Sequence, residues 1–195
     1  LTRRFGMAYR AEDLYLTVGA AAALCCVFRA LACPGDEFVL LAPYFTEYDV
    51  FVRGNGGTPV VVPPDYETFQ PDLAALAKAV GPHTKGVVVN SPNNPSGAIY
   101  PAETIEKIAG ILREKEAEYG HPIYLISDEP YREIVFRGYT VPWLPAFYDD
   151  TIVCYSYSKS LSLPGERIGY ILLGEKVAER EDLYAAVCGA GRVLG

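Results

Sequence analysis

Histidine is scarce in this chain, which has only His83 and His121 among its 195 residues. Each histidine lies beside a proline, in a segment with the composition of a loop. Histidine is the commonest metal ligand and the usual base in nucleophilic triads, so two loop histidines are poor material for either kind of site. The sequence therefore predicts no metal centre and no histidine-based triad, and the chemistry has to come from other side chains.

Long apolar runs and secretory signals are also missing: no segment has the pattern of a membrane span or of a signal peptide. The formal net charge of −7 and the pI near 4.9 argue against nucleic acid or an anionic membrane as the main partner. The cysteines are odd in number, lie in apolar surroundings and lack metal-ligand spacing, which predicts reduced thiols in a cytoplasmic protein. They are Cys25, Cys26, Cys33, Cys154 and Cys188.

Hydrophobic residues make up 50% of the chain, and stretches typical of strands alternate with stretches typical of helices. Buried strands are expected at residues 14–18, 37–42, 58–62, 86–90, 123–127, 151–155 and 168–173. Helices are expected at residues 19–32, around 48–52, and at 69–80, 101–118 and 175–188. This alternation predicts one α/β domain.

The stretch Ser156-Tyr157-Ser158-Lys159 follows one of the buried strands, and Arg167 comes eight residues after the lysine. A lysine amine that is partly desolvated and close to another cation loses its proton easily and attacks carbonyls. Hydroxyls and a guanidinium beside it are suitable partners for a phosphate ester. The segment therefore predicts a lysine that forms a Schiff base with a phosphorylated aldehyde. The alternative, for this segment alone, is a surface lysine in a serine-rich loop.

A phosphate site is also indicated at Gly19, where the strand at 14–18 turns into a helix that starts with Ala20 and Ala21. A glycine at such a turn lets the backbone approach a ligand closely, and the first amides of a helix point outward without partners. This arrangement suits an anion the size of a phosphate. The alternative is an ordinary strand-to-helix junction.

Three further candidate side chains follow buried strands. Phe45 can stack on a planar ligand, with Tyr44 as its neighbour, although an aromatic residue at such a position is more often part of the core. Asn94 lies in a turn whose prolines restrict the backbone on either side. Asp128, followed by Glu129, needs a facing cation to offset its burial. Because ligand sites in open α/β sheets gather at the carboxyl ends of strands, these positions and the two described above predict a single site.

In combination, three motifs resemble those of a known family. They are Asn93-Asn94-Pro95-Ser96-Gly97, Asp128-Glu129-Pro130-Tyr131, and Ser156-Tyr157-Ser158-Lys159 followed by Arg167-Ile168-Gly169. In this order and spacing they are similar to the motifs of fold-type I pyridoxal-phosphate enzymes, and most of all to those of class I/II aminotransferases. The resemblance covers residues 1–195 and implies a large, cofactor-binding domain. Its expected architecture is a three-layer αβα sandwich around a mixed, mostly parallel sheet of about seven strands.

The resemblance implies a role for each candidate residue, with Lys159, Asp128 and Tyr131 as the catalytic ones. Lys159 would hold pyridoxal 5′-phosphate as a Schiff base and then shuttle the proton at the substrate α-carbon. Asp128 would face the pyridine nitrogen and keep it protonated, which makes the ring an electron sink. Asn94 and Tyr131 would hydrogen-bond the phenolic oxygen, and Phe45 would stack on the ring. The phosphate would be bound by Ser156, Arg167 and the backbone at Gly19, Ala20 and Ala21, with Ser158 as a weaker candidate.

The resemblance also implies groups beyond these residues. The chain starts at Leu1, has Met7 as its only methionine and ends at Gly195 after a helical pattern, so we expect an excerpt of a longer protein. In the family, the arginine that binds the substrate carboxylate lies in a C-terminal small domain, and the enzymes are homodimers. If the carboxylate were instead held within this sequence, Arg132 and Arg192 would be the first positions to test.

Three functions stay open at this point. The first is a pyridoxal-phosphate-dependent aminotransferase that interconverts an amino acid and a 2-oxo acid, working as a cytoplasmic homodimer. The second is a carbon–sulfur β-lyase or a related elimination enzyme, which would use the same cofactor contacts. The third is a regulatory protein that senses the cofactor, which would need a DNA-binding module outside this sequence. The amino donor and acceptor cannot be named from these residues.

Overall fold

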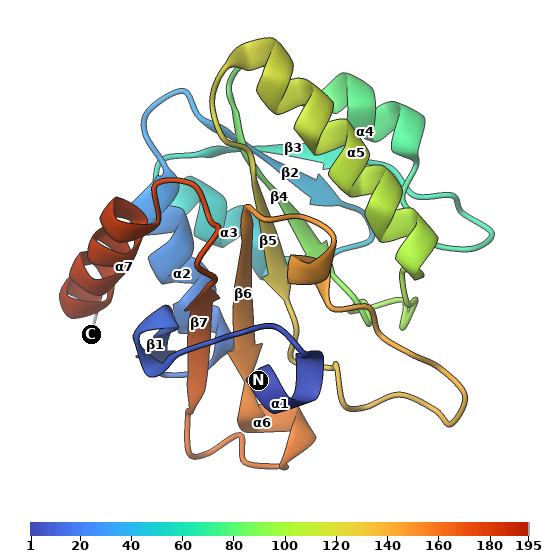
Figure 1. The fold of residues 1–195 in the computed structure, drawn as a ribbon. Helices are drawn as coiled ribbons and strands as arrows, with labels where there is room; N and C mark the ends of the chain where they lie inside the picture. Colours follow the sequence, from blue (N-terminus) through green and yellow to red (C-terminus); the bar gives the residue numbers. More distant parts are fainter. Residues whose placement is uncertain (195) are drawn as a thin grey trace.

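The computed structural model describes residues 1–194, which form one seven-stranded sheet with helices on both faces (Figure 1). The strands are β1 (Leu14–Thr17), β2 (Glu37–Leu41), β3 (Thr58–Val62), β4 (Thr84–Asn90), β5 (Tyr124–Asp128), β6 (Thr151–Ser156) and β7 (Gly169–Leu173). The longer helices are α2 (Ala20–Leu31), α3 (Glu47–Gly54), α4 (Leu73–Ala79), α5 (Ala102–Tyr119) and α7 (Arg180–Leu194). Short helical turns are α1 (Thr2–Phe5), η1 (Ala11–Asp13), η2 (Leu144–Ala146) and α6 (Tyr157–Ser160).

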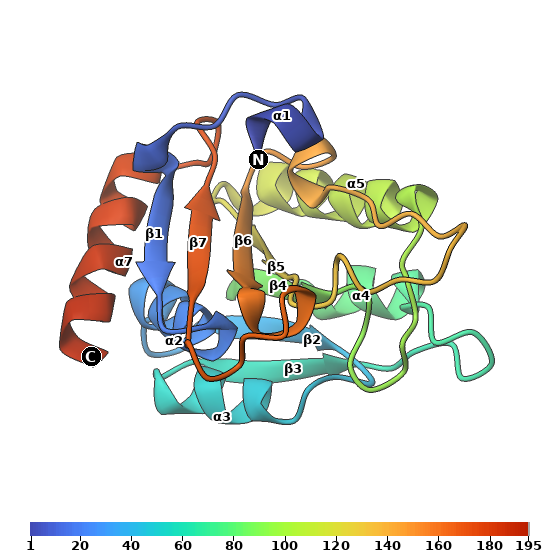
Figure 2. The ribbon, with the colours of Figure 1, turned by 90° about the horizontal axis from the view of Figure 1, so that it is seen from below.

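The strand order across the sheet is β1-β7-β6-β5-β4-β2-β3. Strands β2 to β6 pair in parallel, whereas β7 runs antiparallel to both of its neighbours, β1 and β6. Figure 2 shows β1, β7 and β6 side by side, with the arrow of β7 reversed. The carboxyl end of β1 and the amino end of β7 therefore meet the carboxyl ends of the parallel strands at one edge. The predicted mixed, mostly parallel sheet of about seven strands is confirmed.

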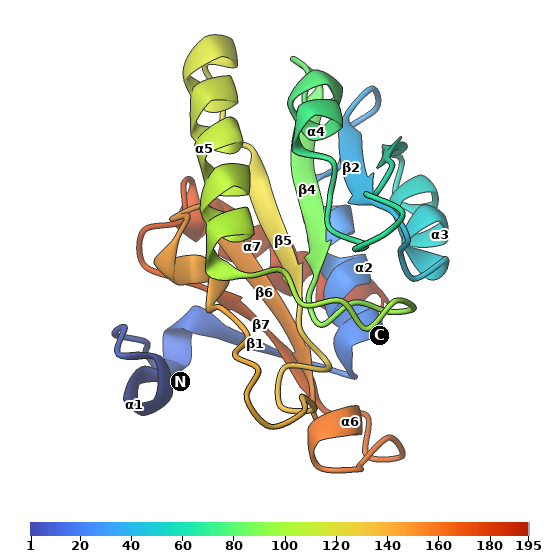
Figure 3. The same cartoon turned by 90° about the vertical axis from the view of Figure 1, so that its right-hand side faces the viewer.

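Each face of the sheet has its own apolar core. Helices α2, α3 and α7 cover one face, where Phe28 and Val187 pack in the same cluster as Ile126 of β5. Helices α4 and α5 cover the other face, where Leu76 and Ile108 pack with residues of β4 and β5. In Figure 3, α5 runs alongside β5 and α4 overlaps the upper part of β4. The central strands are buried on both sides, which explains their uninterrupted apolar sequences and confirms the three-layer prediction.

The helix boundaries differ from the predicted ones in three places. Helix α4 begins at Leu73 rather than at residue 69, because the Asp72 side chain caps it by accepting a hydrogen bond from the Ala75 amide at 2.9 Å. Helix α7 spans Arg180–Leu194 rather than 175–188, because residues 174–177 form a turn first. The third difference is α6, a single turn of helix in a segment where the sequence predicts no helix.

Candidate active site

A cavity of about 340 Å³ opens at the edge of the sheet where the parallel strands end. Ten of the eleven residues that the sequence singled out line it: Ala20, Ala21, Phe45, Asn94, Asp128, Tyr131, Ser156, Ser158, Lys159 and Arg167. The eleventh, Gly19, lies against the guanidinium group of Arg167. A larger hollow of about 840 Å³ shares Tyr131 with this cavity, but its lining includes no lysine and no carboxylate. The side chains capable of chemistry are therefore gathered in the smaller cavity.

One end of the cavity is formed by the start of α2 and by Arg167. Helix α2 begins at Ala20, so its first backbone amides have no partners within the helix. Gly19 precedes it with a φ of 93°, a left-handed conformation that favours glycine, and a Cβ there would lie 2.9 Å from Arg167 Nη2. The Arg167 guanidinium donates hydrogen bonds to the carbonyls of Pro164 at 3.1 Å and of Val18 at 3.4 Å. These contacts hold a positive charge beside the free end of a helix.

Helix α6 adds hydroxyls and the lysine to the same end. Ser156, the last residue of β6, caps α6 by accepting a hydrogen bond from the Ser158 amide at 3.0 Å. The Ser156 and Ser158 hydroxyls are hydrogen-bonded to each other at 2.7 Å. Lys159 lies on this single turn, and its side chain lines the cavity. Hydroxyls, a guanidinium and helix amides together make a suitable binding site for a phosphate group.

Asp128, the last residue of β5, brings a buried carboxyl group to the cavity. Its side chain is 5% exposed, and the Tyr48 hydroxyl of α3 donates a hydrogen bond to Oδ2. Its other oxygen, Oδ1, has no hydrogen-bond partner within residues 1–194. Burial raises the pKa of Asp128 to about 7, while the Tyr48 hydrogen bond lowers it and the charge of Glu129 raises it. A buried acceptor without a partner is costly, so Oδ1 is suited to a cationic N–H group inside the cavity.

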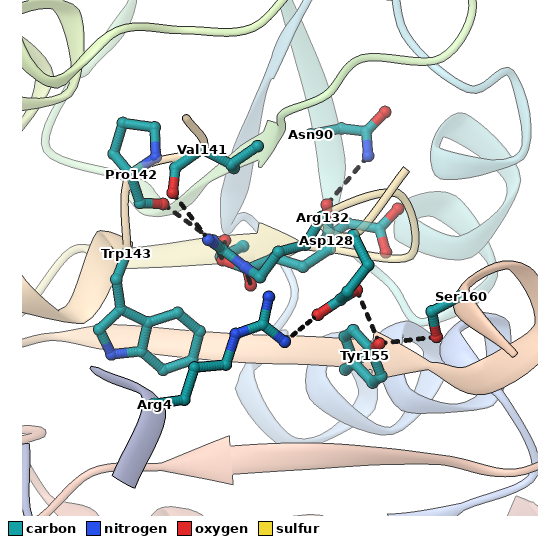
Figure 4. Close-up of polar contacts among 12 residues, drawn as sticks. Arg4, Asn90, Asp128, Arg132, Val141, Pro142, Trp143, Tyr155 and Ser160 are labelled. Carbon is teal, nitrogen blue, oxygen red and sulfur yellow. Dashed lines mark hydrogen bonds and ion pairs between the residues drawn. The ribbon is translucent and has the colours of Figure 1, made fainter. Parts of the chain in front are cut away.

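Two asparagines fix the geometry around this carboxylate. The Asn90 side chain donates to the backbone carbonyl of Asp128 at 2.9 Å (Figure 4). It also accepts a hydrogen bond from the backbone amide of Asn94 at 2.7 Å. It thus ties the ends of β4 and β5 together. The pKa of Tyr131 is raised by burial and by the charge of Asp128, and it is lowered by the Asn94 side chain. The Asn93 side chain, by contrast, donates to the Pro43 carbonyl at 2.9 Å and braces the turn.

Arg132 and Arg192, the sequence candidates for binding a substrate carboxylate, do not line the cavity. Arg132 is 5% exposed and pairs with Glu129, with 2.5 Å between its Nε and Oε2. Arg192 lies in the last turn of α7 and is not among the residues that line the cavity. Neither therefore faces a substrate bound beside Lys159.

The sequence interpretation missed two residues of the site, Tyr48 and Asn90. The sequence places Tyr48 in a helix and indicates nothing more, although a buried tyrosine hydroxyl needs a partner. The partner, Asp128, is 80 positions away, so the sequence alone could not identify it. The sequence predicts Asn90 as the end of a strand, and a polar residue at the end of a buried apolar run is the signal that points to it.

The residues of the cavity fit pyridoxal 5′-phosphate. The amides of α2, the hydroxyls of α6 and Arg167 suit its phosphate. The unpartnered Oδ1 of Asp128 suits the N–H of a protonated pyridine ring. Lys159 in the same cavity supplies the amine for its aldehyde, and Phe45 supplies an aromatic face.

Comparison with known protein sequences gives consistent matches. The family model for aminotransferase class I and II matches residues 1–186. A probable aspartate/prephenate aminotransferase of Thermus aquaticus is 39% identical over 170 residues, covering 86% of this chain and 43% of that protein. An arginine–pyruvate transaminase of Pseudomonas aeruginosa is 35% identical over 173 residues, covering 87% of this chain and 42% of that protein.

Solved structures match the whole fold. An aminotransferase from Eubacterium rectale has a TM-score of 0.98 and 55% identity, covering 100% of this chain and 49% of that one. The aspartate aminotransferase of Thermus thermophilus with maleate has a TM-score of 0.86 and 34% identity, covering 99% of this chain and 48% of that one. The chain thus spans just under half the length of these relatives.

Proposed function

The chain belongs to the class I and II aminotransferases, and from this premise we propose that it forms the cofactor-binding part of an enzyme that interconverts an amino acid and a 2-oxo acid. Enzymes of this family depend on pyridoxal 5′-phosphate. The observation that carries the proposal is the buried, unpartnered Oδ1 of Asp128 in one cavity with Lys159 and the anion site. That combination matches a ligand with a cationic ring nitrogen, an aldehyde and a phosphate.

When bound, the cofactor supplies an electron-accepting ring that takes up the negative charge developing at the α-carbon of the amino acid. Lys159 has two tasks in this proposal: it holds the cofactor covalently, and its released amine then moves the proton at the α-carbon. Asp128 stabilises a positive charge on the ring nitrogen. Its pKa of about 7 applies without a facing cation, and a cation within hydrogen-bond distance favours the ionised carboxylate.

The other cavity residues bind and orient the cofactor. Asn94 and Tyr131 donate hydrogen bonds to the ring oxygen in this proposal, which is supported by their place in the cavity lining with Asp128. The phosphate is bound by Ser156, Ser158, Arg167 and the backbone at Gly19, Ala20 and Ala21. Phe45 covers the ring face in this proposal, because it lines the cavity while Tyr44 does not. Holding the cofactor at several points fixes the bond to be broken relative to the lysine amine.

The substrate carboxylate needs a further cation. Among residues 1–194, Arg167 is the only arginine that lines the cavity, and it is assigned to the phosphate. We therefore propose that the carboxylate-binding arginine lies outside these residues, and that residues 1–195 constitute one large domain of a longer protein.

We also propose that the working enzyme is a cytoplasmic homodimer. The apolar side chains of Leu16 and Val18, 74% and 54% exposed beside β1, support an interface with a second subunit. Within residues 1–194, no helix has both the length and the apolar character needed to cross a membrane. Measuring the molar mass of the full-length protein in solution tests the dimer.

An assay of the full-length protein separates aminotransferase from β-lyase activity. The protein is loaded with pyridoxal 5′-phosphate and mixed with an amino acid and a 2-oxo acid. The proposal predicts a new 2-oxo acid and a new amino acid in equal amounts, and no more than one 2-oxo acid per active site when the acceptor is left out. Release of thiol and pyruvate from a cysteine conjugate without an acceptor would instead favour the lyase. A panel of donors that includes aspartate and arginine would then define the substrate.

A further inference from the structure

Asp128 is the last residue of β5, and Glu129 follows it directly. Both carboxylates are buried: Asp128 is 5% exposed and Glu129 is 1% exposed. Asp128 lines the cavity, while Glu129 is directed away from it, toward Arg132. Building on the proposed function, we propose that Arg132 is a positioning residue of the cofactor site. By pairing with Glu129 and fixing the turn that carries Tyr131, it weakens the effect of the Glu129 charge, so that Asp128 is the carboxylate that acts most strongly on the cofactor ring.

The contacts of Arg132 support this role because all three nitrogens of its guanidinium donate hydrogen bonds. Nε donates to Glu129 Oε2 at 2.5 Å and Nη2 donates to Oε1 at 2.6 Å, a two-point pair that fixes both groups. Nη1 donates to the Val141 carbonyl at 3.0 Å, and Nη2 also donates to the Pro142 carbonyl at 2.8 Å. Figure 4 shows these bonds crossing from the end of β5 to the chain before Trp143. Arg132 thus closes the loop that begins at Tyr131.

Aromatic rings keep water away from this pair. The Arg132 guanidinium lies 5.0 Å from the Trp143 ring centroid and 5.5 Å from that of Phe5, which stack on each other at 3.8 Å. The Arg132 side chain is only 4% exposed. Charges in such a dry environment are screened weakly, so their effects extend to neighbouring groups. Ser127 also donates a hydrogen bond to Glu129 Oε1 at 2.7 Å, a further contact that holds this carboxylate in place.

The charge of Glu129 reaches Asp128, since it contributes to the raised pKa of that carboxyl, after burial itself. Removing Arg132 would leave the Glu129 charge uncompensated and raise the pKa of every proton-binding group in the cavity. Removing the Glu129 charge would leave the Arg132 cation and lower those pKa values. The titratable and charged groups around Asp128 are Tyr48, Tyr131, Cys154 and Lys159. Those around Glu129 are Tyr9, Arg132 and Tyr170, together with the Arg4–Glu133 pair along the same turn.

The test uses the full-length protein loaded with pyridoxal 5′-phosphate and follows its visible absorbance band as a function of pH. Three variants are compared with the wild type: Arg132→Met, Glu129→Gln and the double variant. We expect Arg132→Met to raise the pH midpoint of the band and Glu129→Gln to lower it, each on the order of one pH unit. The double variant should return the midpoint close to the wild-type value, because both charges are gone. Melting temperatures measured alongside report the structural cost separately.

Each outcome decides the proposal. Equal midpoints in the wild type and all variants, with only the melting temperature changed, would reduce Arg132 to a structural residue and overturn the inference. If Arg132→Met fails to fold, Glu129→Gln and the double variant still decide it, since a lowered and then restored midpoint is required. A wild-type protein without a pH-dependent band would overturn the proposed function, and this inference with it. A normal wild-type band combined with shifts of the wrong sign would overturn the inference alone.

Discussion

Replacing Asp128 by asparagine should affect stability and activity in opposite directions. Asparagine has nearly the same shape, and its oxygen can still accept the hydrogen bond from Tyr48. Its amide group, however, cannot accept a hydrogen bond from a ring N–H or stabilise a positive charge there. The loss of a charge-assisted hydrogen bond in a dry site corresponds to about 3 kcal/mol, or about a hundredfold in the transamination rate.

The stability effect follows from the raised pKa of Asp128. Burial, the main cause, raises this pKa from 3.8 to about 7. Between about pH 4 and pH 7 the folded protein therefore holds a proton that the unfolded chain has lost, so the free energy of unfolding falls as the pH rises through this window. The full cost, present above pH 7, is at most about 4 kcal/mol. Asp128→Asn removes this cost and should stabilise the cofactor-free protein by up to that amount at pH 8, and by about 2 kcal/mol at pH 5.

Urea denaturation of the cofactor-free full-length protein at pH 5 and pH 8 measures the first effect, and single-turnover kinetics with an amino acid measure the second. Asp150→Asn is a matched control at the opposite edge of the sheet, since burial raises the pKa of Asp150 to about 6 and its side chain accepts a hydrogen bond from the Ala178 amide. The control should also gain stability at high pH, yet keep the wild-type rate. An Asp128→Asn variant that is less stable than wild type at pH 8, or equally active, would refute this reasoning.

Two further predictions concern the phosphate end of the cavity and the extent of the chain. Gly19→Ala and Gly138→Ala both force a side chain into a left-handed backbone, with φ of 93° and 95°, and each should lose about 1–2 kcal/mol of stability. Only Gly19→Ala should weaken pyridoxal 5′-phosphate binding in a fluorescence titration, by about tenfold. Its Cβ would displace Arg167, whereas a Cβ at Gly138 would meet open space. Equal affinities of the two variants would contradict the assignment of the phosphate site to Gly19 and Arg167. Residues 1–195 expressed alone should bind the cofactor weakly and transaminate at negligible rates, because orientation of the substrate carboxylate is missing. An ordinary KM for an amino acid in that preparation would show that the carboxylate is bound within this sequence.

The sheet and its ligand edge could be predicted because their signals are local. The apolar run Val87-Val88-Val89 is typical of a strand buried on both faces, and β4 is indeed buried on both faces. Polar residues that follow such strands, including Asn94 and Asp128, meet in space because parallel strands end at the same edge. Arg167 reaches this edge because β7 runs antiparallel to its neighbours. The resemblance implies a mixed sheet but does not say which strand is reversed.

The contacts that tune the site were out of reach of the sequence because they join distant residues. Tyr48 approaches Asp128 only once α3 packs on the sheet. The sequence identifies Glu129 only as the residue after Asp128, whereas in the structure it is buried and paired with Arg132, so Glu129→Gln leaves a buried cation without its partner. The single turn of α6 was missed because a four-residue helix has no periodicity to detect.

The most direct test of the account locates the covalently bound cofactor. The full-length protein is incubated with pyridoxal 5′-phosphate, treated with borohydride, digested and analysed by mass spectrometry. We predict that the pyridoxyl group is on Lys159, and that Lys159→Ala abolishes the labelling. Lys107 and Lys176 are internal controls, because each forms a surface ion pair outside the cavity, with Glu103 and Asp149. Finding the group on either of these lysines, with Lys159 unmodified, would contradict the account.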